Sequence, residues 1–407
     1  MRDRLHLIAL AVIAVLTLVL VVKVRRDPPC AVDEPGWLRS GGITYQLVVE
    51  RASPAQWETA YGDSDFDNRN PPIGKLVVGG MLAAAGVHRP NYKWTWPLSY
   101  RENLALGTLP PPEVLRAVRL GFTLVAAITL VLTYCIAWRL TRSAWAIAAP
   151  VYLFSLPVFQ FLGARVYTDI IEVTLMLASG LAALICVEQP RRWTALVVAA
   201  VAAGLACATK FSAAPLVIGL AFVVGRISRF RLLAMAIAVL VPVLVFVAVN
   251  PYLYRTPVTR TRGLITAWGE LIGRQQVRSP GFAVRSRLTK LKLVATRTIF
   301  PERFEGTSIG LRLVLPVILL VGLCRVRWPW LTIVVVQAAV TALWLPFDWQ
   351  PYYLPTLGMM APAFATGLQA CERTLSRATT AIPGLAPAPA RRASDEDLRR
   401  DGRAASP

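Results

Sequence analysis

Histidine, paired cysteine and charged side chains are all scarce in this sequence. The 407 residues include two histidines, His6 and His88, which lie too far apart for a zinc-protease or Ser-His-Asp hydrolase signature. The six cysteines show no paired spacing, and most fall inside or at the ends of apolar runs, where a thiol behaves as a small hydrophobe. A disulfide framework and a cysteine-rich metal site are therefore not expected.

Apolar residues take the place of the missing charge. They make up 55% of the chain against 16% charged residues, and the mean hydropathy is +0.52, values typical of a polytopic membrane protein. The net charge of +21 comes from Arg and Lys that lie mainly between apolar runs, where they orient a protein and meet anionic lipid. We therefore expect the lipid bilayer as a partner, and no nucleic acid.

The apolar runs predict an all-α protein with about ten transmembrane helices. The first run is not followed by a small-x-small cleavage site, so we interpret it as a retained helix. A further apolar piece, residues 76–87, is too short to cross the bilayer and favours an interfacial helix. The ten runs are 5–22, 119–138, 143–162, 169–187, 193–209, 211–225, 232–249, 308–324, 328–346 and 351–370.

The positions of the basic residues predict the topology. Arginine clusters fall in every second connection, so a cytoplasmic N-terminus satisfies the positive-inside rule and places the C-terminus in the cytoplasm too. The Ala-, Arg- and Val-rich usage favours a bacterial inner membrane. We expect a transmembrane domain over 1–371, a first exoplasmic loop with interfacial helices over 23–118, a basic exoplasmic loop over 250–307, and a disordered cytoplasmic tail over 372–407.

The basic loop departs from the positive-inside trend. It carries eleven Lys or Arg against three Glu, a net charge of +8. Basic residues recur at about every third or fourth position from Arg274 to Arg297, which predicts a helix that rests on anionic headgroups or holds a phosphate.

Two adjacent carboxylates, Asp33 and Glu34, follow the first span closely and precede Pro35. Carboxylates beside a bilayer are costly unless something uses them, so we predict a reaction centre here with one of the pair as a general base. The alternative is a helix N-terminal cap, because acidic residues favour helix starts.

Cations for an anionic substrate lie on the same expected side of the membrane. Lys75, Arg165 and Lys210 are candidates to bind a phosphate, and Asp169 is a second acidic candidate. Each has a structural alternative: Lys75 as a snorkelling side chain, Arg165 as a flanking anchor, Lys210 as part of a turn and Asp169 as a helix cap.

Four short stretches together resemble the GT-C glycosyltransferases, with protein O-mannosyltransferases and lipid A aminoarabinose transferases as the nearest groups. They are the Asp33-Glu34 pair, Asn70-Pro71-Pro72-Ile73-Gly74-Lys75, Arg119-Leu120, and Ala164 to Asp169. The resemblance covers residues 1–225 in order, and more weakly residues 348–355.

The resemblance implies a GT-C-like fold and an inverting transfer of a monosaccharide from a polyprenyl-phosphate donor to an extracytoplasmic lipid, glycan or protein. Carried over by residue, Asp33 is the base, Glu34 orients the acceptor or a metal, Lys75 contacts the donor phosphate and Asp169 is the second acidic residue. The family usually has His or Glu where this chain has Asn70, and in some members that residue helps bind a divalent cation. This departure argues against a metal here, although the sequence leaves a divalent cation open as a cofactor. The alternatives are a transporter or flippase, or a non-catalytic binder, of lipid-linked sugars.

Overall fold

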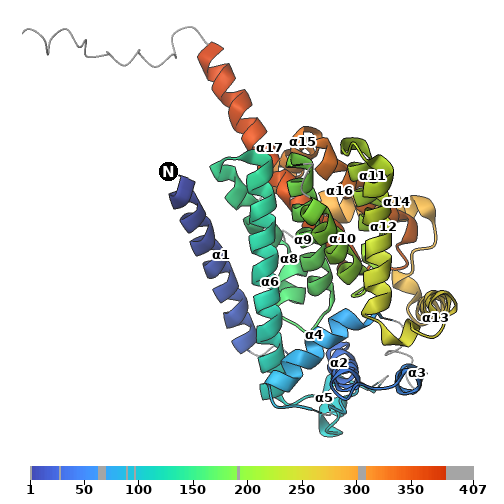
Figure 1. Ribbon diagram of the computed structural model, residues 1–407. Helices are drawn as coiled ribbons and strands as arrows, with labels where there is room; N and C mark the ends of the chain where they lie inside the picture. Colours follow the sequence, from blue (N-terminus) through green and yellow to red (C-terminus); the bar gives the residue numbers. More distant parts are fainter. Residues whose placement is uncertain are drawn as a thin grey trace, which may run out of the picture.

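The computed structural model describes residues 2–26, 29–62, 70–88, 90–95, 98–189, 193–300 and 309–381, and they form a helical bundle capped at one end by shorter helices (Figure 1). The described residues contain no β-strand, only an isolated bridge between Ala283 and Phe347. The predicted all-α fold is confirmed.

Each predicted apolar run contains a helix. The elements of the bundle are α1 (Arg2–Arg25), α6 (Pro112–Thr141), η1 (Ala144–Ile147) with α7 (Ala148–Ser155) and α8 (Pro157–Gly163), α9 (Asp169–Glu188), α10 (Trp193–Cys207), η2 (Phe211–Ala213) with α11 (Ala214–Ile227), α12 (Arg231–Ala248), α15 (Ile309–Arg325), α16 (Trp328–Trp344), and η5 (Gln350–Tyr353) with α17 (Leu354–Ala381).

Among the described residues, four helices are by themselves long and apolar enough to cross a membrane: α1, α6, α9 and α12. Several others are apolar but shorter. The run 143–162, expected as one continuous span, is bent by 74° between α7 and α8. The bend falls at Leu156, whose backbone is extended, because Pro157 disfavours a helical conformation of the residue before it.

The first loop forms helices at one end of the bundle: α2 (Glu34–Val49), α3 (Pro54–Gly62), α4 (Pro72–Ala84) and α5 (Tyr100–Ala105). The expected short helix at 76–87 is α4, which begins earlier and packs closely on α2. The first residue of α1 and the last of α17 lie at the opposite end of the bundle (Figure 1).

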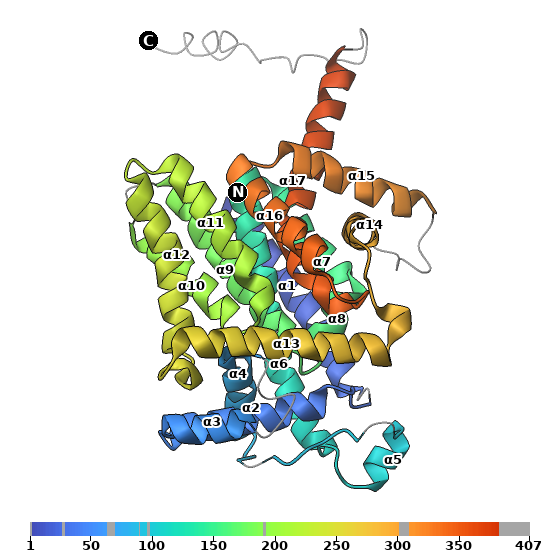
Figure 2. The same cartoon turned by 90° about the vertical axis from the view of Figure 1, so that its right-hand side faces the viewer.

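The basic loop forms two helices rather than the single one expected across Arg274 and Arg297. These are α13 (Pro257–Arg278) and α14 (Arg287–Ile299), separated by residues 279–286, where Pro280 interrupts the helical pattern. α13 runs roughly at right angles to the bundle (Figure 2). This orientation fits a helix lying in the plane of a membrane surface.

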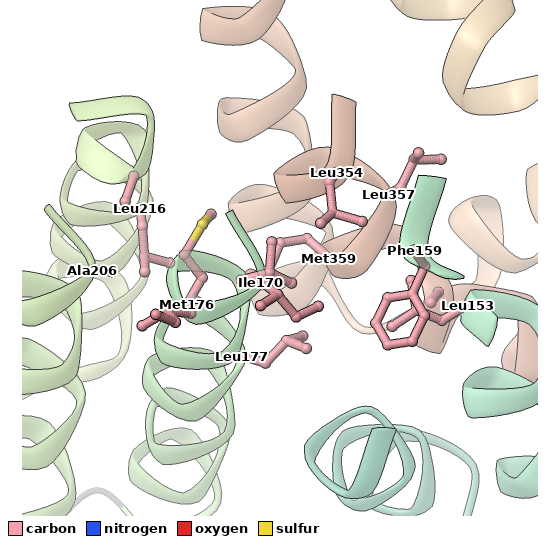
Figure 3. Close-up of a cluster of buried hydrophobic side chains, with 14 of the residues drawn as sticks. Leu153, Phe159, Ile170, Met176, Leu177, Ala206, Leu216, Leu354, Leu357 and Met359 are labelled. Carbon is pink, nitrogen blue, oxygen red and sulfur yellow. The ribbon is translucent and has the colours of Figure 1, made fainter. Parts of the chain in front are cut away.

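The core lies between α9 and its neighbours. Figure 3 shows side chains from α9, such as Ile170, Met176 and Leu177, meeting Leu216 of α11 and Met359 of α17. This burial is why α9 holds its first turn, which carries Asp169, in a fixed place. α17 continues through Ala381, and the remaining part of the expected tail, 382–407, lies outside the described residues.

Candidate active site

Asp33 occupies the N-cap position of α2, and Pro35 in the first turn fixes the start of that helix. Its side chain does not cap the helix. The residue is exposed to solvent, yet surrounding protein desolvates the carboxylate and raises its pKa, an effect that Asp169 and Glu34 reinforce and that Lys210 and a hydrogen bond from Tyr167 oppose. A carboxylate that is accessible and has a raised pKa is suited to accept a proton.

Glu34 faces a different environment from its neighbour. Its side chain is fully buried, and Arg119 of α6 donates to both of its oxygens, over 2.9 Å to Oε1 and 2.6 Å to Oε2. The backbone N–H groups of Val166 and Ala31 donate to the same carboxylate, over 3.0 Å and 2.7 Å. Four donors leave this carboxylate fully hydrogen-bonded.

Arg165 lies at the edge of this pair. Its Nη1 is 3.7 Å from Glu34 Oε2 and donates to the carbonyl of Pro29 over 2.9 Å. Burial lowers the pKa of Arg165, with Glu34 opposing that shift. The guanidinium is only partly shielded, with 15% of the side chain exposed, so part of it remains accessible.

Asp169 and Lys210 form an ion pair beside Asp33. Lys210, between α10 and η2, donates from Nζ to Asp169 Oδ1 over 2.7 Å, and its ammonium lies 5.8 Å from the centre of the Trp37 ring. Asp169 begins α9, where the partial positive charge of a helix N-terminus favours a carboxylate. The predicted residues Asp33, Asp169 and Lys210 therefore come together.

One turn further along α9, Glu172 is fully buried and accepts a hydrogen bond from Ser212 Oγ over 2.6 Å. Asp169 Oδ2, Glu172 Oε2 and Thr168 Oγ1 are buried without a hydrogen-bond partner among the described residues. Three such atoms within five consecutive residues are unusual, because a buried polar atom without a partner costs roughly 1–3 kcal/mol.

α4 docks its first turn against the segments that carry these residues. The Ile73 N–H donates to the carbonyl of Ala208 over 2.9 Å, and a Cβ added at Gly74 would come within 2.6 Å of the Thr168 side chain. Lys75 is fully buried in the same turn. The Pro-Pro-Ile-Gly-Lys stretch thus has a structural reason: proline starts the helix and glycine permits its close approach.

Two tyrosines complete the surroundings of Asp33. Tyr167 is buried, and desolvation together with the charges of Asp33, Glu34 and Asp169 raises its pKa, so its hydroxyl remains protonated and can donate. Tyr352 of η5 is close enough to Asp169 and Asp33 for their charges to act on its hydroxyl.

Four residues of the site were not predicted from the sequence: Arg119 as the partner of Glu34, Tyr167, Glu172 and Ser212. Glu172 did carry a signal, because an acidic residue inside an apolar run is a functional candidate by default. Among the described residues, no three His, Cys, Asp or Glu side chains are arranged to hold a metal ion. No metal-binding residues are assigned.

Comparisons with known proteins agree with this architecture. Residues 112–254 match the family model described as dolichyl-phosphate-mannose-protein mannosyltransferase. The structure is similar to that of ArnT from Cupriavidus metallidurans bound to undecaprenyl phosphate, with a TM-score of 0.55 and 15% sequence identity. The superposition covers 91% of this chain and 62% of the ArnT chain. The apo state of that protein gives a TM-score of 0.51 at 14% identity and covers 91% and 61%. No curated protein sequence matches.

The protein therefore has the GT-C fold, arranged as a multi-pass membrane protein. Residues 112–254 are similar in sequence to the mannosyltransferase family, and the chain as a whole is similar in fold to ArnT. The chain spans 62% of the length of ArnT.

Proposed function

We propose that this protein is an integral-membrane glycosyltransferase that moves a monosaccharide from a polyprenyl-phosphate donor to an extracytoplasmic acceptor. The family match over 112–254, the GT-C fold and the presence of undecaprenyl phosphate in the similar ArnT structure support the donor class. The observation that carries the proposal is Asp33: an accessible carboxylate with a raised pKa beside the Lys210 ammonium.

In the proposed reaction, an acceptor hydroxyl attacks the anomeric carbon of the sugar while its proton passes to the Asp33 carboxylate. The bond from the anomeric carbon to the phosphate oxygen breaks on the opposite face, and polyprenyl phosphate leaves with the electron pair. Configuration is inverted because one displacement occurs. General-base assistance of this kind contributes about 10²–10⁴-fold to a rate.

The cations divide into two roles in this proposal. Lys210 and Arg165, both partly accessible, stabilise charge on the departing phosphate. Lys75, the third predicted contact, is fully buried, so its role in this proposal is to add positive charge behind the phosphate rather than to touch it. Arg119 neutralises Glu34 and is fully buried, so this pair positions α2, and with it Asp33, rather than touching substrate. Glu34 is thereby a positioning residue.

The proposed active site faces the extracytoplasmic side. α2 and α4 lie at the end of the bundle away from the N-terminus of α1 and the C-terminus of α17 (Figure 1). The arginine clusters at 139–142 and 325–327 end or begin helices at that far end, and arginine-rich ends favour the cytoplasm.

The test is release of free polyprenyl phosphate, measured by mass spectrometry. Purified wild type is given a panel of polyprenyl-phosphate monosaccharides with membrane extract as acceptor source, with and without a chelator. We expect release from one donor by wild type, and a loss of about 100-fold or more in Asp33→Asn.

Glu58→Gln is the matched control, because it also removes a carboxylate from the first loop. Glu58 pairs with Arg255 and Arg260 rather than with residues of the site. It should retain wild-type release. Turnover by Asp33→Asn close to that of wild type would remove Asp33 from the mechanism. Binding of the lipid without release from any donor would instead favour a transporter or a non-catalytic binder.

A further inference from the structure

At the end of the bundle opposite Asp33, one carboxylate is shared by three arginines. Glu188, the last residue of α9, pairs with Arg139 in the last turn of α6. Arg142, the C-cap of α6, places Nη2 at 3.5 Å from Glu188 Oε1, and Arg327, the N-cap of α16, places Nη1 at 3.2 Å from the same oxygen. Three helices therefore bring their charged ends to one point.

The charges in this cluster do not balance. Three guanidinium groups face one carboxylate, which leaves a net charge of +2. Glu188 is mostly covered, with 18% of its side chain exposed, whereas 49% of Arg142 and 50% of Arg327 is exposed. Each guanidinium has five N–H donors, so most donors of Arg142 and Arg327 remain available on the outer side.

The cluster lies at the depth of lipid headgroups. α9 spans twenty residues from Asp169 to Glu188, about 30 Å at the helical rise, which is the thickness of the hydrocarbon core. The Trp328 side chain beside Arg327 is 44% exposed, and Arg226 stacks over its ring at 5.9 Å. Exposed Trp next to Arg is typical of the membrane interface, where the ring meets acyl chains and the cation meets phosphate.

We infer that Arg142 and Arg327 form a binding site for an anionic phospholipid, with the two phosphodiesters of a diphosphatidylglycerol as the best match to the excess charge of +2. Guanidinium groups bind phosphate oxygens in a bidentate manner, and basic pockets between transmembrane helices hold such headgroups. A zwitterionic lipid is disfavoured because its own cation faces the arginines. The inference does not depend on the proposed glycosyl transfer.

The experiment is native mass spectrometry of the full chain in detergent, titrated separately with diphosphatidylglycerol, phosphatidylglycerol, phosphatidylcholine and inorganic phosphate. We expect wild type to retain diphosphatidylglycerol most strongly. The double variant Arg142→Gln/Arg327→Gln should bind it roughly tenfold more weakly, because two charge-assisted contacts are lost. The matched control is Arg229→Gln/Arg231→Gln, which removes the same charge from two exposed arginines near the start of α12 and should bind as wild type does.

Glu188→Gln gives a change of the opposite sign. It removes the carboxylate that competes for the guanidinium groups, so lipid binding should tighten if the site is real. Equal losses in both double variants would reduce the effect to general positive charge and overturn the inference. Unchanged binding in Arg142→Gln/Arg327→Gln, equal retention of phosphatidylcholine, or full competition by inorganic phosphate would overturn it as well.

Discussion

Two groups of charged residues lie side by side at the loop end of the bundle, one around Glu34 and the other around Asp33. They differ in how many of their carboxylate oxygens have hydrogen-bond partners. Glu34 is fully buried and has four donors, two of them from the buried Arg119 guanidinium. Around Asp33, by contrast, Lys210 donates a hydrogen bond to only one oxygen of Asp169. Asp169 and Glu172 each have one buried oxygen without a hydrogen-bond partner among the described residues.

We call the Glu34–Arg119 pair the frame, and the group around Asp33, with Asp169, Lys210 and Glu172, the site. A fully paired buried charge fixes the relative positions of α2, α6 and the segment before α9, and has nothing left with which to bind a substrate. A cluster with spare acceptors is costly on its own, and a ligand that supplies hydroxyl groups would satisfy it. Two adjacent residues therefore have different roles: Glu34 belongs to the frame and Asp33 to the site.

Breaking the frame should have the largest effect on stability. Glu34→Gln leaves the buried Arg119 charge without its counter-ion, and removing one partner of a buried pair costs about 3–5 kcal/mol. Asp33→Asn should have the reverse effect: desolvation by the surrounding protein raises the pKa of Asp33, so its ionised form costs folding free energy at neutral pH, and the neutral amide removes that cost. Thermal unfolding of both variants in the same detergent measures the contrast.

Arg119→Gln combined with Glu34→Gln is the control for this prediction. With both charges gone, no uncompensated ion remains, so the double variant should regain much of the stability that Glu34→Gln loses. Equal melting temperatures for Glu34→Gln and wild type would contradict the assignment of this pair to the frame.

The sequence predicted the helices well and the pairings poorly. Long apolar runs, such as 5–22, have one stable solution in a bilayer, since a helix satisfies its own backbone hydrogen bonds. The break at Leu156 was missed although Pro157 marks it, because hydropathy alone shows one continuous run.

The site could be predicted in its parts but not in its arrangement. Asp33, Asp169 and Lys210 stood out as charges at the ends of apolar runs, and the structure brings them together. Arg119 stood out only as part of the Arg119-Leu120 stretch, and only the packing of α6 against the first loop reveals its pairing with Glu34, 85 residues earlier. A contact between residues so far apart in the sequence produces no local sequence pattern from which it could be predicted.

Shifting α4 sharpens the comparison, because the first turn of α4 packs against Thr168, next to Asp169 of the site. A Cβ at Gly74 would come within 2.6 Å of the Thr168 side chain, so Gly74→Ala should cost about 1–3 kcal/mol and reduce glycosyl transfer through displacement of Lys75. Gly80→Ala on the same helix meets nothing within 4 Å and should leave both unchanged or add slight stability. Unfolding and polyprenyl-phosphate release, measured together, test this; equal behaviour of the two variants would contradict the proposed docking of α4.

The smallest change acts on the titration of Asp33 alone. Tyr167 donates a hydrogen bond that favours the ionised form of Asp33, so Tyr167→Phe should raise the pKa of this carboxyl further. Because a general base must be deprotonated, activity falls as the pH drops through the pKa of Asp33. The acidic limb of the pH–rate profile should therefore move to higher pH in Tyr167→Phe.

Tyr353→Phe is the matched control, because its hydroxyl donates over 2.8 Å to Asp348 Oδ1 rather than to Asp33. It removes a comparable hydroxyl near the site and should leave the acidic limb in place. If Tyr167→Phe lowers kcat without moving the limb, Tyr167 only packs against the site and Asp33 is not the titrating base. A limb that moves in Tyr167→Phe alone ties the proton of the reaction to Asp33, which the structure separates from the saturated Glu34 beside it.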